Sequence, residues 1–383
     1  MNSMVANGID CIDKYDNWFR GKRIGLITSP SGVNRQLEST ISILHRRFGL
    51  SALYSPEHGV RGDREAGAVV DTYIDPYINV PVYSLYRKDS KRFTEEMLEG
   101  VDTVVYDMQD VGTRYYTFIY SMLYAMEDCA RYGKEFIVLD RINPLGGTVV
   151  EGNILQDGYR SFVGGYSLCM RYGLTIGEFA TMARAEAGNA CDLKVVRCEG
   201  WQRDMLFRDT GCLWVMPSMG ICSPDTALLY PGMCLFEGTN LSEGRGTTRP
   251  FEIMGASFID AQRLADAMNR KGIPGVLFRP VHFTPYASKY KGELCHGVQV
   301  HVVNPQEVRS VTVGISLLYE IYAAYPEQLE FLPPYKEGSR PFMDLLAGND
   351  RLRGFPLSQQ ELLESYAADA AAFTERKQQY HLY

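Results

Sequence analysis

Residues 55–63 carry the densest set of ionisable side chains in the sequence. Glu57, His58, Arg61 and Asp63 fall within nine residues, and two glycines allow the backbone to bend between them. A carboxyl group held in a pocket can have its pKa raised enough to donate a proton near neutrality. We therefore predict that Glu57 and His58 are catalytic, with Glu57 as the general acid, and that Arg61 and Asp63 bind substrate. The alternative is a solvated loop with a local ion pair.

Two further polar clusters end apolar runs later in the chain. Asp107, Gln109 and Asp110 end one run, and Asp140 and Arg141 follow the next. We predict that Asp107 and Asp110 assist catalysis by stabilising developing positive charge. Arg141 is predicted to bind substrate because arginine binds a carboxylate through two parallel hydrogen bonds. Its neighbour Asp140 and the amide of Gln109 are predicted to bind substrate as well. The alternatives are that Asp110 caps the following helix, and that Asp140 and Arg141 form an interdomain salt bridge.

A second dense polar loop spans residues 236–250. Its glycines permit close backbone approach, and its carboxylate, amide, hydroxyl and guanidinium groups are of the kinds that bind a sugar. The alternative is a solvated surface loop. The predicted substrate-binding residues in this loop are Glu237, Asn240, Glu243, Arg245 and Arg249.

The elements that must position these residues alternate between strands and helices. Apolar runs predict strands at 23–28, 50–54, 81–86, 101–108 and 135–139, and helical spacing predicts helices at 37–48 and 115–129. Such alternation predicts right-handed crossovers, a mostly parallel sheet and an α/β fold. Because ligands bind at the carboxyl ends of parallel strands, we expect the polar clusters to gather at one edge of the sheet.

The chain is long enough for two domains. At 383 residues it exceeds one ordinary core, and the alternating pattern loosens after two consecutive glycines at 146 and 147. We predict a catalytic domain with a mostly parallel sheet over residues 1–155 and an α+β domain over 156–383 that closes a cleft.

Composition and charge exclude several classes of partner. The chain has 46 acidic and 39 basic residues and no long basic run, so we expect no nucleic-acid partner. It has no apolar stretch of about 18 residues that would span a bilayer. Its N-terminus lacks the basic start and apolar core of a signal peptide, and its nine scattered cysteines favour a reducing compartment. We expect a cytoplasmic protein, or a secreted or periplasmic one if a leader has been removed. The oligomeric state is left open.

Common cofactor signatures are missing from the sequence. It contains neither G-x-G-x-x-G after the first predicted strand nor G-x-x-x-x-G-K-[ST], and H-E-x-x-H and G-x-S-x-G are also absent. The six histidines are scattered. We therefore expect no nucleotide, metal or other cofactor.

The motifs together resemble the exo-β-N-acetylmuramidase (NamZ) family of bacteria, from about residue 23 to the end of the chain. They are Pro56-Glu57-His58-Gly59, Gln109-Asp110-Val111-Gly112, Leu139-Asp140-Arg141-Ile142-Asn143-Pro144 and the long glycine-rich loop at 237–250. The resemblance implies a Rossmann-like N-terminal domain and an active site between two domains. It also implies a glycosidase of cell-wall recycling that releases N-acetylmuramic acid from the non-reducing end of peptidoglycan fragments. Residues 217–224 differ from the family pattern, which bears on fine substrate preference.

Two alternatives to this function come from other classes. One is a non-catalytic sensor that binds muramyl sugars, and the other is a metal-dependent hydrolase of amide or phosphate bonds. A sensor would bind a chromogenic muramide without releasing product, whereas a metal-dependent hydrolase would lose activity with a chelator.

Overall fold

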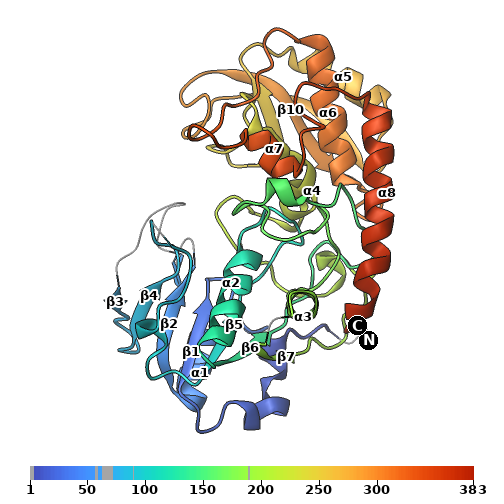
Figure 1. Cartoon of the computed structure of the whole chain (residues 1–383). Coiled ribbons are helices and arrows are strands. Elements are labelled where there is room, and N and C mark those ends of the chain that lie inside the picture. The colour runs from blue at the N-terminus through green and yellow to red at the C-terminus, as the bar shows by residue number, and fades with distance from the viewer. Residues whose placement is uncertain (1–3, 57–58, 63–71, 89, 189) are drawn as a thin grey trace.

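A seven-stranded sheet forms the base of the molecule (Figure 1). The computed structural model describes residues 4–56, 59–62, 72–88, 90–188 and 190–383. The strand order is β3-β4-β2-β1-β5-β6-β7, and every pair is parallel except β3 with β4. The strands are β1 Ile24–Thr28, β2 Leu50–Ser55, β3 Tyr73–Ile74, β4 Pro81–Ser84, β5 Thr103–Asp107, β6 Glu135–Leu139 and β7 Asp192–Val196. This sheet confirms the predicted α/β class.

The strand order reverses between β1 and β5. From β1 the chain builds outward through β2 on one side, and β5 then returns to pair with the other side of β1. In open parallel sheets, ligands bind at such a switch point, just beyond the carboxyl ends of the strands. The segments that follow β1, β2, β5 and β6 all start from this edge.

Helices cover both faces of the sheet because alternate strand residues point to opposite sides. Leu26 and Val105 pack in one buried cluster with η1 and α1, whereas their neighbours Ile27 and Val104 pack in the other with α2 and α3. The covering elements are η1 Gly8–Trp18, α1 Thr40–Phe48, α2 Phe118–Arg131 and α3 Ile176–Glu186. A short 3₁₀ helix, η2 Glu96–Leu98, precedes β5.

The second unit is built on a three-stranded antiparallel sheet with the order β8-β10-β9. Its strands are β8 Ile253–Ala256, β9 Val276–Phe283 and β10 Cys295–Val302. The helices of this part of the chain are α4 Pro224–Met233, α5 Ala261–Arg270, α6 Ser310–Ala324 and α7 Phe342–Ala347. The short 3₁₀ helices are η3 Asp157–Tyr159, η4 Phe207–Asp209, η5 Cys234–Gly238 and η6 Gln378–Tyr380.

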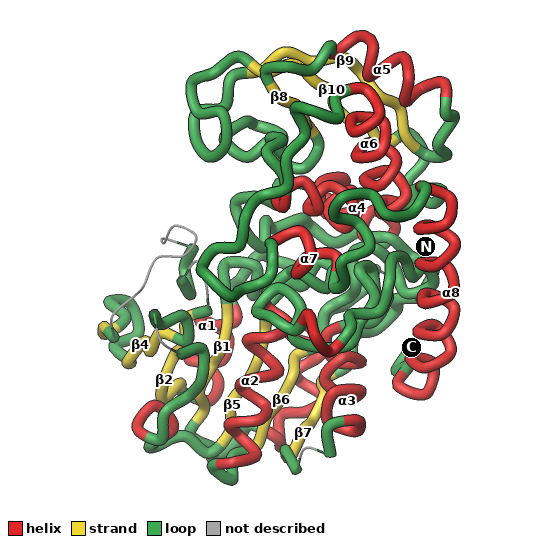
Figure 2. The backbone as a smooth tube through the Cα atoms, turned by 45° about the horizontal axis from the view of Figure 1, so that its top comes forward, coloured by secondary structure: helices red, strands yellow, loops and turns green. Residues whose placement is uncertain are grey.

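The long helix α8, Gln359–Lys377, runs along one side of the molecule and joins the two units (Figures 1 and 2). At its end Lys377 is buried and donates hydrogen bonds to the carbonyls of Gly147 and Gly173. The preceding Arg376 forms an ion pair with Glu186 of α3. These contacts attach α8, which also packs on α6, to the sheet domain.

The large sheet contains residues from both sides of the predicted domain boundary at residue 155. Its last strand, β7, lies beyond that boundary in the sequence and pairs with β6.

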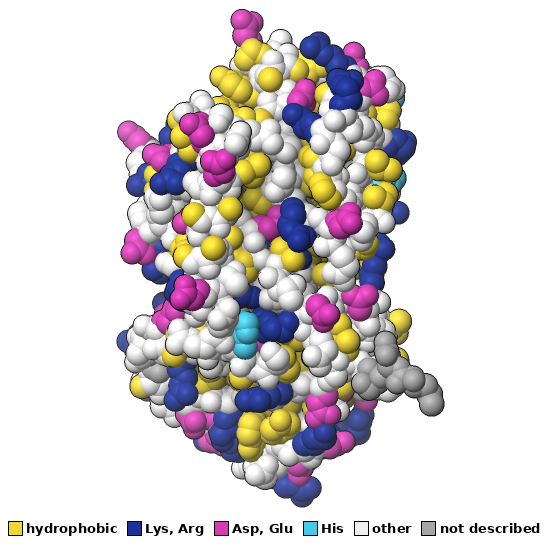
Figure 3. Space-filling model, turned by 90° about the vertical axis from the view of Figure 1, so that its right-hand side faces the viewer, with side chains coloured by type: hydrophobic (Ala, Val, Ile, Leu, Met, Phe, Trp, Pro, Cys, Tyr) yellow, Lys and Arg dark blue, Asp and Glu magenta, His cyan; other side chains and the backbone are white. Residues whose placement is uncertain are grey.

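Charge is mixed on the face that carries α8. Lysine and arginine side chains lie among aspartate and glutamate side chains over this whole face (Figure 3). Within the described ranges, no helix has both the length and the apolar character that crossing a bilayer requires.

Candidate active site

Two pockets lie on either side of the segment 214–221. The first, here called the interdomain pocket, has a volume of about 180 Å³ and brings together the start of α2, residues 218–221 and the second unit. The second, the switch-point pocket, has a volume of about 110 Å³ and lies over the ends of β1, β5 and β6. The Trp214 indole in one pocket donates a 3.3 Å hydrogen bond to the carbonyl of Ile221 in the other.

Aromatic rings form much of the interdomain pocket. Tyr230 of α4 meets Phe251 edge to face, with ring centroids 4.7 Å apart, and lies 5.9 Å from Tyr115 and 6.1 Å from Tyr116. Aromatic side chains offer an apolar face together with a polar group, which suits contact with a sugar ring. The two tyrosines reach the pocket because α2 begins at Phe118, so they precede the helix that we predicted to start with Tyr115.

A carboxylate and a guanidinium supply the charge of this pocket. Glu237 Oε1 accepts a 2.8 Å hydrogen bond from Arg245 Nε, and the Arg245 guanidinium also lies 4.9 Å from the Phe251 ring. Burial raises the pKa of Glu237, an effect that Arg245 opposes. Glu243 lies behind this pair, almost fully buried, with Lys289 Nζ 3.0 Å from its Oε2. The glycine-rich loop thus places two carboxylates around one arginine.

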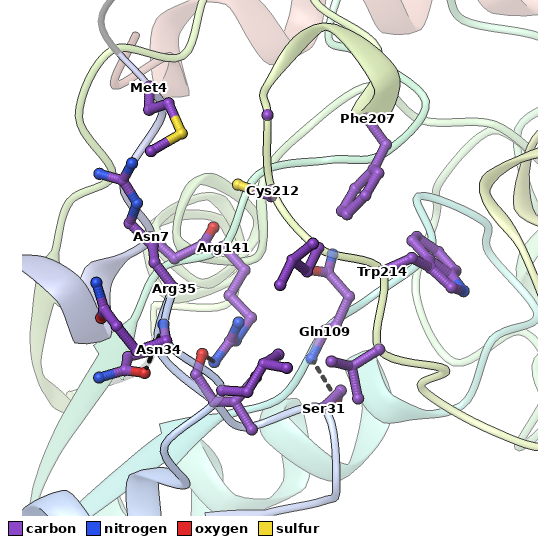
Figure 4. A pocket seen from close by; sticks show the side chains of 16 residues that line it. Met4, Asn7, Ser31, Asn34, Arg35, Gln109, Arg141, Phe207, Cys212 and Trp214 are labelled. Atoms are coloured by element: carbon purple, nitrogen blue, oxygen red, sulfur yellow. Dashed lines mark hydrogen bonds between the residues drawn. The ribbon is translucent and has the colours of Figure 1, made fainter.

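The switch-point pocket has a polar floor and an apolar wall. In Figure 4 the Arg141 guanidinium lies between Asn34 and Gln109, with Phe207 and Trp214 on the far side of Gln109. The described lining residues are Met4, Asn7, Ser31, Val33, Asn34, Arg35, Gln36, Leu37, Gln109, Arg141, Phe207, Gly211, Cys212, Leu213, Trp214 and Val215.

Asp107 is committed to holding Arg141. Its Oδ1 accepts from Arg141 Nε at 2.6 Å and its Oδ2 from Arg141 Nη2 at 2.9 Å, and Thr40 of α1 donates to Oδ2 as well. The aspartate is fully buried at the end of β5. Arg141 therefore pairs with Asp107 rather than with its neighbour Asp140.

Asp110 and Asp140 are also buried and hydrogen-bonded. Asp110 Oδ2 accepts from the Gly112 amide at 2.6 Å and from the Tyr172 hydroxyl, so it closes a turn and does not cap α2, whose N-cap is Thr117. Burial raises the pKa of Asp110 to about 6, although these hydrogen bonds oppose the shift. In the same way, burial raises the pKa of Asp140 to about 7.

Asp140 joins three elements of the sheet domain. It follows β6, and its Oδ1 accepts from the Gly177 amide at the start of α3 at 2.7 Å. Its Oδ2 accepts from Thr175 Oγ1 at 2.8 Å and from the Tyr383 hydroxyl at 2.6 Å. Both oxygens of the Asp140 carboxylate thus accept hydrogen bonds from other residues of the chain, and Asp140 lines neither pocket.

Three other predicted residues line neither pocket. Arg61 forms a bidentate ion pair with Asp75 at 2.8 and 2.9 Å. The Asn240 side chain pairs with the backbone of Gln328 and Glu330, and Arg249 lies 3.3 Å from Glu252. Glu57, His58 and Asp63 lie outside the described residues, so their predicted roles stay predictions.

The structure adds lining residues that sequence reasoning missed. These are Tyr115, Tyr116, Ser218, Tyr230 and Phe251 in the interdomain pocket, and Asn34, Arg35, Phe207 and Trp214 in the switch-point pocket. The adjacent tyrosines Tyr115 and Tyr116 could have indicated a binding site, because they lie just before the start of α2. The prediction missed them because the helical spacing placed them inside the helix. Among the described residues, no group of three or more histidine, cysteine, aspartate or glutamate side chains is arranged to hold a metal ion.

A two-domain α/β protein with a polar, aromatic-lined pocket between its domains is the class that fold and site define. Comparison with known proteins shows to which family within this class the chain belongs. The family model described as exo-β-N-acetylmuramidase NamZ, N-terminal, matches residues 24–225, and its C-terminal counterpart matches residues 228–383. The chain is 45% identical over 385 residues to the peptidoglycan β-N-acetylmuramidase NamZ of Bacillus subtilis (strain 168), covering 99% of this chain and 91% of that protein.

Two crystal structures of DUF1343 family proteins from Bacteroides fragilis NCTC 9343 have the same fold. One has a TM-score of 0.91 and 38% identity, covering 99% of both chains. The other has a TM-score of 0.78 and 28% identity, covering 100% of this chain and 99% of that one. The chain belongs to the exo-β-N-acetylmuramidase NamZ family, which confirms the resemblance seen in its motifs.

Proposed function

We propose that this protein is an exo-β-N-acetylmuramidase, a glycosidase that releases N-acetylmuramic acid from the non-reducing end of peptidoglycan fragments. The observation that carries the proposal is the 45% identity to a peptidoglycan β-N-acetylmuramidase over 99% of the chain. Both halves of the chain match the family, so the two surfaces that meet at the interdomain pocket are each those of a NamZ protein.

The sugar binds in the interdomain pocket. The aromatic rings of Tyr115, Tyr116 and Tyr230 line it, and Glu237 and Arg245 offer charge. Binding pockets of this kind have mostly apolar walls with a few placed polar groups, and they form preferentially between domains. The volume of about 180 Å³ suits one sugar ring and its substituents.

Arg245 binds the lactyl carboxylate that distinguishes muramic acid. Among the other arginines predicted to bind substrate, Arg141 lines the switch-point pocket instead, and Arg61 and Arg249 line neither pocket. The Arg245 side chain lines the interdomain pocket and is 41% exposed, so a ligand can reach it. An arginine can hold two carboxylates at once because it presents five N–H donors.

Glu57 is the general acid of the reaction. The assignment rests on the sequence, in which Glu57 comes two residues after the end of β2 at the ligand-binding edge. Glycoside cleavage normally uses two carboxyl groups on either side of the bond. Glu237 is the one carboxylate among the described lining residues of the interdomain pocket, which makes it the candidate for the second. Asp107 and Asp110 are enclosed by their own partners and act by supporting the site.

Turnover of a chromogenic N-acetylmuramide tests this function. We expect release of the chromophore by the protein as purified and unchanged activity after exhaustive chelation, since paired acids need no metal. Binding without release would identify a muramyl-sugar sensor. Activity that returns only with an added divalent ion would identify a metal-dependent hydrolase.

A further inference from the structure

We propose that the switch-point pocket is a second binding site, separate from the interdomain pocket, for a small carboxylate whose α-carbon carries a hydroxyl or an amide N–H group. The site stands on its own chemistry and does not depend on the muramidase activity. It has a volume of about 110 Å³, which has room for a short acid or the end of a peptide.

Arg141 supplies the anchor for the carboxylate. The residue is only 4% exposed, and it lines the pocket. Its Nε and Nη2 bind Asp107, and Nη2 also donates to the Val33 carbonyl at 2.9 Å. Among the residues that the structure describes, Nη1 has no hydrogen-bond partner. A guanidinium that lines a pocket can donate a charge-assisted hydrogen bond to an anionic ligand, so the pocket favours a carboxylate at this point.

Gln109 selects the group on the neighbouring carbon. Its Nε2 donates to the carbonyls of Asp110 at 2.7 Å and Ile142 at 3.0 Å, which fixes the orientation of the side-chain amide. Oε1 is therefore the atom left to act as an acceptor, and it has no donor among the described residues. Gln109 is 5% exposed, and its backbone amide is held by Ser31 at 3.0 Å. A ligand hydroxyl or amide N–H would satisfy this oxygen.

The rest of the lining agrees with an anion of this size. Two arginines and no acidic residue are found among the described lining residues. Asp107 is neutralised by Arg141, while Asp10 lies behind the wall and accepts from the Arg35 and Asn7 amides. Phe207 packs edge to face on Trp214, with centroids 4.8 Å apart, and offers an apolar surface to the carbon skeleton of the ligand.

The position of Trp214 provides a direct readout. The protein has three tryptophans, of which Trp18 and Trp201 lie outside the pocket, so 5-fluorotryptophan labelling gives one ¹⁹F resonance in the pocket and two internal references. Trp214→Phe assigns the resonance. D-lactate and N-acetyl-D-alanine serve as probes, and they represent a free hydroxy acid and a peptide end. Lactamide lacks the charge of lactate, and propionate lacks the hydroxyl.

We expect lactate, N-acetyl-D-alanine or both to shift the Trp214 resonance saturably and to leave the other two unchanged. Lactamide is expected to cause no saturable shift, and propionate to bind more weakly than lactate. No saturable shift with either acid, or equal shifts with lactamide, would overturn the site. Equal affinity for propionate would overturn the assignment of Gln109.

Two variants and one control locate the binding. Arg141→Lys keeps the pairing charge for Asp107 but removes the planar donor set, and we expect the Kd to rise about tenfold or more. Unchanged Trp18 and Trp201 resonances show that this variant is folded. Arg35→Gln, whose side chain makes no hydrogen bond with the described residues, is expected to weaken binding about threefold. Arg263→Gln on the exposed face of α5 is the matched control and should change nothing. Wild-type affinity in both pocket variants would contradict the proposal.

Discussion

Arg245 is the one predicted arginine that both lines the interdomain pocket and exposes its side chain to a ligand. It also holds the buried Glu237, so removing it has two effects that must be separated. A guanidinium that binds substrate should change the preference between sugars. One that only neutralises Glu237 should change stability.

A double-mutant cycle separates the two effects. We expect Arg245→Ala to lower kcat/KM for the muramide about tenfold or more and to leave the value for the matching glucosaminide nearly unchanged. Glu237→Gln combined with Arg245→Ala should recover stability, because the uncompensated carboxylate is then gone, while turnover of both sugars stays low because Glu237 is the candidate second carboxylate. Arg249→Ala, outside the pocket, is the matched control. An equal loss of kcat/KM for the two sugars in Arg245→Ala would assign Arg245 a structural role only.

Glu57 is tested by a change that removes the proton and keeps the shape. Glu57→Gln should lower kcat by about 10²–10⁴-fold, the range typical of general acid–base catalysis. Measuring kcat together with the midpoint of thermal unfolding shows whether the loss is chemical. The assignment fails if the variant turns over like the wild type.

At the scale of elements, the junction of β6, α3 and the end of the chain depends on the protonation of Asp140. Its carboxyl accepts from Thr175, Gly177 and Tyr383 in a fully buried position. Burial raises its pKa from 3.8 to about 7. The unfolded chain therefore releases this proton at lower pH than the folded chain does, and the folded state binds more protons between those two values.

It follows that Asp140 stabilises the folded protein most below pH 3.8 and that this contribution is lost as the pH rises to about 7. Asp140→Asn cannot titrate, so the difference in unfolding free energy between variant and wild type should drift in favour of the variant across this range, by at most about 1.4 kcal/mol per pH unit. Urea unfolding at several pH values measures it. Because Asp110 and Lys377 are present in both proteins, their titration cancels. A difference independent of pH would contradict the raised pKa.

The elements were largely predictable from the sequence, and the contacts of individual site residues were not. Buried strands such as β1 and β6 can be recognised in the sequence as short apolar runs that end in polar residues. Hydrophobic periodicity cannot predict that the Asp107 carboxylate accepts hydrogen bonds from Arg141 and Thr40, since those partners come from other elements. It also extended α2 back over Tyr115, because that tyrosine keeps the helical spacing although the helix starts at Phe118.

At the scale of the whole molecule, buried arginines fasten the two units together. Arg114 precedes α2 and donates to the carbonyls of Asn153 and Leu168 on one side and of Leu346 and Ala347 in α7 on the other. It is fully buried. Arg171 lies 3.1 Å from Glu151, whose other oxygen accepts from the Val311 amide of α6. The interdomain pocket is thus built on a fixed junction.

We expect one cooperative unfolding transition for the whole chain, because these bonds cannot be kept when either unit unfolds. Arg114→Lys retains the charge but loses most of the four hydrogen bonds, and should lower the unfolding free energy by about 3 kcal/mol or more. Calorimetry of both proteins measures this, with the exposed Arg263→Lys as the control. Two separate transitions in the wild type would contradict a fixed junction.

The central claim is that this protein recognises and cleaves muramyl glycosides. N-acetylglucosamine lacks only the lactyl ether of N-acetylmuramic acid, so a pair of chromogenic glycosides isolates that group. A site built to pair with a charge leaves its own guanidinium unsatisfied when the analogue lacks the partner. The most direct measurement is kcat/KM of the wild-type protein for both compounds. We expect the muramide to be cleaved and the glucosaminide to be a far poorer substrate, whereas equal values for the two sugars would contradict the muramidase function.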